Sequence, residues 1–71
     1  MSVHDLAPSR ARNELNRLRR GATYRAVTAT GYTTGEYLGV ETTHGVWSIV
    51  LRHAGGFESI PIGRIESIAA A

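Results

Sequence analysis

A run of regularly spaced glycines most constrains what this chain can fold into. Gly31, Gly35 and Gly39 recur every four residues in a segment that is otherwise rich in threonine, tyrosine and valine. In a membrane helix this spacing favours dimerisation, but among strand-forming residues glycine marks bends and close approaches between backbones. The sequence therefore predicts a short sheet that curls strongly on itself.

Five strands are expected after Gly21, because runs of β-branched and aromatic residues alternate there with turn residues. The strands are predicted at about residues 23–30, 34–41, 46–53, 57–62 and 64–69, with breaks at Gly31–Tyr32, His44–Gly45, Gly55–Gly56 and 61–63. In the third run, Trp47, Ile49 and Leu51 share one face, since side chains alternate along a strand. This run is predicted to be the central strand, with Trp47 in the core.

The segment that precedes the strands has the periodicity of an amphipathic helix over about residues 6–20. Asp5 or Ser9 can cap its start and Gly21 its end. The apolar stripe is narrow, so we expect the helix to lie across one end or face of the sheet with its arginines in water. The stripe consists of Ala7, Ala11, Leu15, Leu18 and Ala22.

Length and composition predict a single domain over residues 1–71. Seventy-one residues bury only a modest core, and the chain has no cysteine for disulfides or thiolate zinc sites. Self-association is therefore the expected source of further burial. Neither a signal peptide nor a long apolar run is present, so we expect a cytoplasmic protein that does not enter membranes.

Positive charge is concentrated before the strands. All eight basic residues are arginine, and five of them are Arg10, Arg12, Arg17, Arg19 and Arg20. The planar guanidinium group holds phosphates and carboxylates through paired hydrogen bonds. This cluster indicates either a surface for nucleic acid or an acidic protein, or simply a solvated helix face.

Enzyme chemistry is not expected. His4, His44 and His53 lie far apart with no short metal-ligand spacing, and no nucleophile or phosphate-loop motif is present. The sequence thus predicts no catalytic residue, metal or cofactor.

The expected helix and five bent strands resemble the Sm-like family, which includes the Sm, LSm and Hfq proteins. The segment Gly35-Glu36-Tyr37-Leu38-Gly39-Val40-Glu41 is similar in spacing to the family pattern Gly-x-Leu-x-Gly-hydrophobic-Asp. Residues 15–20 are also similar to the helix end of Hfq, and the resemblance covers about residues 11–68. It implies an Sm-like or SH3-like small barrel.

The chain departs from the family where the family binds RNA. Glu41 takes the place of the loop aspartate, and the asparagine position falls on Gly45 or, with a longer loop, on Ser48. The family's Arg-Gly pair is reversed at Gly63-Arg64, and the Tyr-Lys-His element of Hfq is absent. The resemblance therefore implies the fold more strongly than the uridine pocket.

A homo-oligomeric ring that binds RNA is what the resemblance implies. In such a ring, residues 57–62 of one copy pair with residues 64–69 of the next, which covers both strand edges. His44 is either a plain turn residue or a base contact. Trp47 is either a core residue, which is the expectation, or a base-stacking platform. The predicted nucleic-acid contacts are Arg10, Arg12, Arg17, Arg19, Arg20, Tyr32, Glu41, His44, Ser48 and Arg64.

An alternative reading is an SH3-like barrel that binds a protein partner through an edge strand or groove and has no affinity for nucleic acid. Such a domain is expected to be a monomer or dimer that ignores RNA. Assembly state and response to salt separate the two hypotheses.

Overall fold

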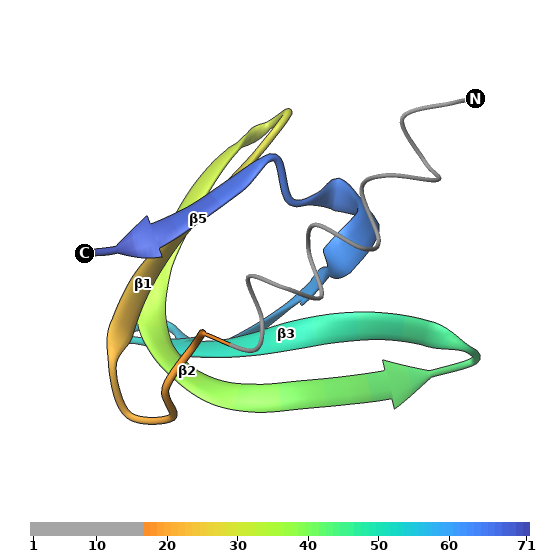
Figure 1. The fold of residues 1–71 in the computed structure, drawn as a ribbon, viewed down its shortest axis with the longest axis horizontal. Helices are drawn as coiled ribbons and strands as arrows, with labels where there is room; N and C mark the ends of the chain where they lie inside the picture. Colours follow the sequence, from red (N-terminus) through yellow and green to blue (C-terminus); the bar gives the residue numbers. More distant parts are fainter. Residues whose placement is uncertain (1–16) are drawn as a thin grey trace.

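The computed structural model describes residues 17–71, which form a five-stranded antiparallel sheet (Figure 1). The elements are β1 (Thr23–Thr28), β2 (Gly31–Thr43), β3 (Val46–His53), β4 (Gly56–Pro61), the 3-10 helix η1 (Ile62–Arg64) and β5 (Ser67–Ala70). The sheet order is β4-β3-β2-β1-β5. The prediction of a mostly β protein with five antiparallel strands is confirmed, and β3 has the predicted bounds.

A long, bent β2 organises the sheet. Its first half pairs with β1 and its second half with β3, and the register shifts between Tyr37 and Gly39. Gly39 has a φ of +138° at this bulge, a conformation that residues with a side chain rarely adopt. Figure 1 shows the result, in which the β1 end and the β3 end of β2 point in clearly different directions.

The core lies inside this bend. Its buried members are Tyr24, Ala26, Tyr37, Ile49, Leu51 and Ile60, and Leu18, Ala22, Ile62, Ile65 and Ile68 pack against them. The rings of Tyr24 and Tyr37 meet edge to face, with centroids 6.2 Å apart. Such a pair adds about 0.5–1.5 kcal/mol to the burial of the two side chains.

The prediction that Trp47 lies in the core is wrong, because its side chain is 60% exposed. Trp47 shares a face with Ile49, which is the last residue of β3 toward the hairpin turn that belongs to the core. Ile49 pairs with Val40, whereas Trp47 pairs with Thr42, two residues closer to the turn. The third strand is also not central, since β2 occupies the middle of the sheet.

The expected barrel is not closed. Within residues 17–71, β4 and β5 each pair with one neighbour and remain the two edges of the sheet. The end of the sheet also differs from the prediction of a strand over 64–69, because the Ile65 N–H donates to the Ile62 carbonyl and closes the η1 turn first. Pro61, which has no N–H to donate, immediately precedes this turn.

Two of the predicted turns are displaced. The β1–β2 turn lies at Ala29–Thr30 because Thr28 pairs directly with Gly31, so β2 starts earlier than expected. The β3–β4 turn lies at 54–55, and Gly56 already pairs with His53.

Residues 6–16 of the predicted helix lie outside the described residues, and residues 17–20 are not helical. The Arg19 N–H donates to the Tyr24 hydroxyl at 2.9 Å, and the Gly21 N–H donates to the Tyr37 carbonyl at 2.9 Å. These two N–H groups therefore donate to acceptors in the sheet instead of to the carbonyl groups of a preceding helical turn. No helix within residues 17–71 is long and apolar enough to cross a membrane.

Candidate functional site

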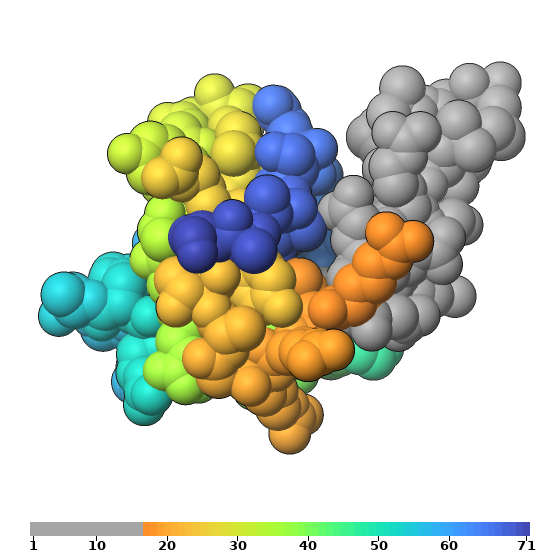
Figure 2. Space-filling model, turned by 60° about the vertical axis from the view of Figure 1, so that its left-hand side comes forward, coloured from red at the N-terminus to blue at the C-terminus, as the bar shows by residue number. Residues whose placement is uncertain are grey.

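Three exposed arginines stand where the described chain enters the sheet. Arg17, Arg19 and Arg20 are all exposed, while Leu18 between them packs against the core and anchors the segment. The guanidinium of Arg20 lies against the β2 bulge, because a Cβ built on Gly39 would be 3.4 Å from its Nε and Nη2 atoms. Figure 2 shows this start of the described chain, in orange, at the molecular surface.

The ion pairs among residues 17–71 leave these three side chains unneutralised. The pairs are Arg52 with Glu36, in which the guanidinium Nε and Nη2 both donate to the carboxylate Oε1, and His53 with Glu58 at 3.9 Å, which is an ion pair only when the imidazole is protonated. Strands and turns from residue 23 onward hold three arginines against four glutamates, so the sheet itself has no excess of positive charge. Positive charge in the described part is therefore local to residues 17–20.

The β2–β3 hairpin continues past the bulge as an arm that carries exposed apolar and aromatic groups. Val40, Val46 and Trp47 are exposed along it, and Trp47 is the only tryptophan of the chain. At its end His44 and Gly45 have φ values of +52° and +79°, the pattern of a tight type I′ hairpin turn. His44 is thus an exposed turn residue at the far end of the arm.

The remaining predicted contacts are scattered. Glu41 and Ser48 are directly opposite each other on the arm, but Ser48 is buried and Glu41 accepts a hydrogen bond from the Ser59 hydroxyl. Tyr32 lies on the β1 half of β2, where the Arg25 guanidinium carbon is 4.8 Å from its ring centroid. Arg64 is exposed in η1, and Arg10 and Arg12 lie outside the described residues. The structure therefore does not gather all predicted contacts into one pocket.

The Tyr37 phenol next to this site has a perturbed acidity. Burial raises its pKa above the ordinary value of 10.0, the positive charge of Arg20 opposes the rise, and Tyr24 adds to it. Tyr37 therefore holds its proton in the folded state at pH values where an unfolded chain begins to lose it.

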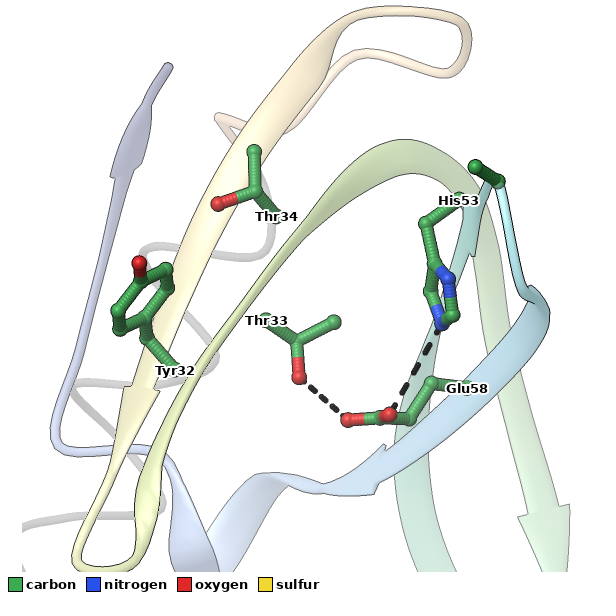
Figure 3. Close-up of a pocket in the computed structure, with 6 residues that line it drawn as sticks. Tyr32, Thr33, Thr34, His53 and Glu58 are labelled. Atoms are coloured by element: carbon green, nitrogen blue, oxygen red, sulfur yellow. Dashed lines mark hydrogen bonds and ion pairs between the residues drawn. The ribbon is translucent and has the colours of Figure 1, made fainter.

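A second polar cluster lies at an open hollow of about 490 Å³ between the β1–β2 and β3–β4 ends of the sheet (Figure 3). The Thr33 hydroxyl donates to one oxygen of Glu58, and His53 Nε2 faces the other oxygen. The Gly55 N–H donates to His53 Nδ1 at 3.0 Å, so a neutral ring carries its proton on Nε2. That tautomer directs a donor at Glu58, which is opposite to what a metal at Nε2 requires.

Sequence reasoning missed two features of the surface. It placed Trp47 in the core, although the position of Trp47 two residues after the Gly45 turn could have shown that it lies near the end of the hairpin. It did not connect Thr33 with Glu58, because the two residues are 25 positions apart and belong to no motif. Among residues 17–71, no group of three or more histidine, aspartate or glutamate side chains is arranged to hold a metal ion.

The fold and the site define a small, open β-domain that presents arginines and an aromatic arm. Comparison of the chain with protein-family models, curated proteins and solved structures found no match. The resemblance to Sm-like proteins stays a prediction.

Proposed function

We propose that this protein binds nucleic acid, with RNA as the expected ligand, through Arg17, Arg19, Arg20 and the β2–β3 arm. The observation that carries the proposal is a set of three exposed arginines that form no ion pair with any other of residues 17–71, of which Arg20 lies against the β2 bulge where the arm with the exposed Trp47 begins. Guanidinium groups bind phosphates, and exposed aromatic rings bind base faces. An acidic protein surface would use the arginines but has no matching need for the aromatic ring.

The proposed function includes self-association. Both edge strands, β4 and β5, present backbone groups that a second copy can pair with, and pairing β4 of one copy with β5 of the next generates a ring. A ring repeats residues 17–20 at regular intervals, so weak phosphate contacts add up along one RNA.

The test is fluorescence anisotropy with a short labelled RNA of mixed sequence over a range of salt concentrations. We expect the affinity to fall steeply with salt, because phosphate binding releases counterions. Replacing Arg17, Arg19 and Arg20 together by Gln is expected to weaken binding and to lower the slope of log K against log salt by about 2. Far-UV circular dichroism confirms that the variant is folded.

Matched single variants supply the control. Arg19→Gln and Arg25→Gln each remove one exposed positive charge, but Arg25 lies on β1 beside Tyr32. Only Arg19→Gln is expected to weaken binding clearly. An equal loss from both variants, or no RNA binding at low salt, contradicts the proposed function.

A second candidate function is binding of a protein strand at the β4 edge. Phe57 on this edge strand is 70% exposed and pairs with Arg52, which favours an apolar contact beside a free strand edge. A monomer that ignores RNA in the experiment above is the result this alternative expects.

A further inference from the structure

Trp47 is exposed in a position that the fold does not require. Residues 17–71 bury only six side chains in the core, yet the only tryptophan of the chain lies outside it at 60% exposure. Its cross-strand partner is Thr42, and its exposed neighbour Val46 pairs with Thr43. The indole therefore lies on the surface of the β2–β3 hairpin.

The side of the sheet that carries Trp47 also carries the arginine segment. Trp47 shares its face of β3 with the buried Ile49 and Leu51, because side chains two residues apart point the same way. Leu18 packs against the same core, and the Arg19 N–H donates to the hydroxyl of the core residue Tyr24. Leu18 and the indole thus lie on the same side of the sheet, the side of the core, and Arg17, Arg19 and Arg20 flank Leu18 in the chain.

The distance along β2 between the Arg20 contact and Trp47 is similar to the spacing of neighbouring nucleotides. Arg20 touches β2 at Gly39, and Trp47 is opposite Thr42, three residues farther along the same strand. At about 3.3 Å per residue this is about 10 Å. A phosphate held at the arginines can therefore belong to a nucleotide next to the one whose base reaches Trp47.

We infer that Trp47 is a base-stacking platform, and that the ligand of the arm is single-stranded nucleic acid. The inference rests on the proposed function. A duplex hides its base faces within the stack, so only an unpaired base can lie on the indole. Charge argues against a symmetric contact between two copies of this surface, because each copy would bring its own Arg17 and Arg19 to an already positive surface, whereas nucleic acid brings phosphates.

Because Trp47 is the only tryptophan, its fluorescence reports on this position alone. The experiment titrates the full chain with an RNA as a single strand and as the corresponding duplex, and follows indole emission together with anisotropy of labelled RNA. We expect the free protein to emit like a solvent-exposed indole. The single strand quenches that emission in parallel with binding, and the duplex binds more weakly without quenching it.

Matched aromatic variants test the role of the indole. Trp47→Ala is expected to lower single-strand affinity about tenfold or more, and Trp47→Phe to retain most of it. Tyr32→Ala is the control, since Tyr32 is an aromatic residue of similar exposure, at 67%, but lies on the β1 half of β2, away from both the arm and the strand edges, and is expected to leave the affinity unchanged. Circular dichroism of each variant checks that the sheet is intact.

Three results overturn the inference without overturning the proposed function. One is arginine-dependent RNA binding without quenching and without loss in Trp47→Ala, which leaves the proposed function standing. Another is equal binding and quenching by the duplex. The third is an emission of the free protein that shifts to the blue with protein concentration, which assigns Trp47 to self-association. Absence of any arginine-dependent binding removes the proposed function and the inference together.

Discussion

Gly35 and Gly39 are close neighbours on β2, but each is required for a different physical reason. A Cβ on Gly35 would lie 2.7 Å from the carbonyl oxygen of Arg52, so the absence of a side chain lets β3 approach β2. Gly39 instead adopts the positive φ of the bulge and receives the Arg20 guanidinium. One glycine permits close backbone contact, and the other permits the bend.

Gly35→Ala is expected to destabilise the protein by about 1–3 kcal/mol, because the added methyl meets backbone that cannot move aside cheaply. Gly63→Ala is the matched control, since a Cβ built there has no neighbour within 4 Å. Urea unfolding followed by circular dichroism measures both variants. Equal stability of the two variants contradicts the close approach at Gly35.

Because the Tyr37 phenol is buried, the free energy of unfolding is expected to depend on pH in the alkaline range. Burial raises the pKa of its phenol above the ordinary value of 10.0, against the opposing charge of Arg20. The folded state therefore keeps the proton longer than the unfolded chain does, and the stabilisation is complete below pH 10.0 and lost as pH rises through the folded pKa.

We expect Tyr37→Phe to lose less stability than the wild type between about pH 9 and about pH 11, in urea unfolding measured at both values. Tyr32→Phe alters an exposed ring and is expected to keep the full wild-type loss. If Tyr37→Phe loses as much stability as the wild type over this interval, burial of the Tyr37 phenol is not the cause of the alkaline loss of stability.

At the scale of elements, the β2–β3 hairpin joins the fold to the candidate site. Its base contributes Tyr37, Ile49 and Leu51 to the core, and its far end carries Trp47 and His44 into solvent. The His44–Gly45 turn sets the register of the pairs from Thr43 with Val46 back to the bulge. The geometry of this turn therefore controls where Trp47 is presented.

Two substitutions in this turn separate its structural role from a role in binding. Gly45→Ala places a side chain at a φ of +79° and is expected to cost about 1–2 kcal/mol. His44→Asn is expected to preserve stability, because asparagine tolerates positive φ well. If His44 also contacts a base, His44→Asn weakens RNA binding at unchanged stability, as measured by urea unfolding and anisotropy. A loss of stability in His44→Asn contradicts the expected turn geometry.

Local patterns predicted the elements whose interactions are local. Alternation of side chains and the His44–Gly45 turn were enough to give the bounds of β3, and the regular glycines indicated the bend. The helix was wrong over residues 17–20 because Tyr24 and Tyr37 supply hydrogen-bond acceptors that no helical periodicity reveals. The exposure of Trp47 depends on where the core ends along the arm, and this depends on the bulge. The contact of Thr33 with Glu58 joins residues 25 positions apart and has no local signal.

At the scale of the whole molecule, the sheet bends around its core but leaves two edges. Within residues 17–71, β4 and β5 pair on one side only, and six side chains are buried in the main core. Unpaired strand edges favour association with another chain, and a small core gains stability from it. Self-association is therefore an expectation that the open edges of the sheet support as well as its small size.

The hydrogen bonding of β5 shows how to test this association. The Ala71 N–H donates to the Thr23 carbonyl, and Ala70 pairs with Tyr24 in the same register. Backbone groups alternate in direction along an antiparallel pair, so the Ala70 N–H points away from β1, toward the free edge. Proline at this position removes a donor that a second copy can use and leaves the pairing with β1 intact.

We expect the wild type to be a multimer in light scattering after size exclusion, at both low and high salt, because strand pairing does not depend on screened charges. Ala70→Pro is expected to shift the mass toward the monomer, whereas Ala70→Val, which keeps the N–H, retains the multimer.

The assembly also bears on binding, because a monomer offers only one set of Arg17, Arg19 and Arg20. Ala70→Pro is therefore expected to weaken RNA binding in proportion to the loss of multimer. A wild type that is monomeric at every concentration measured contradicts assembly through the edges, and it leaves binding to a single copy of the arm.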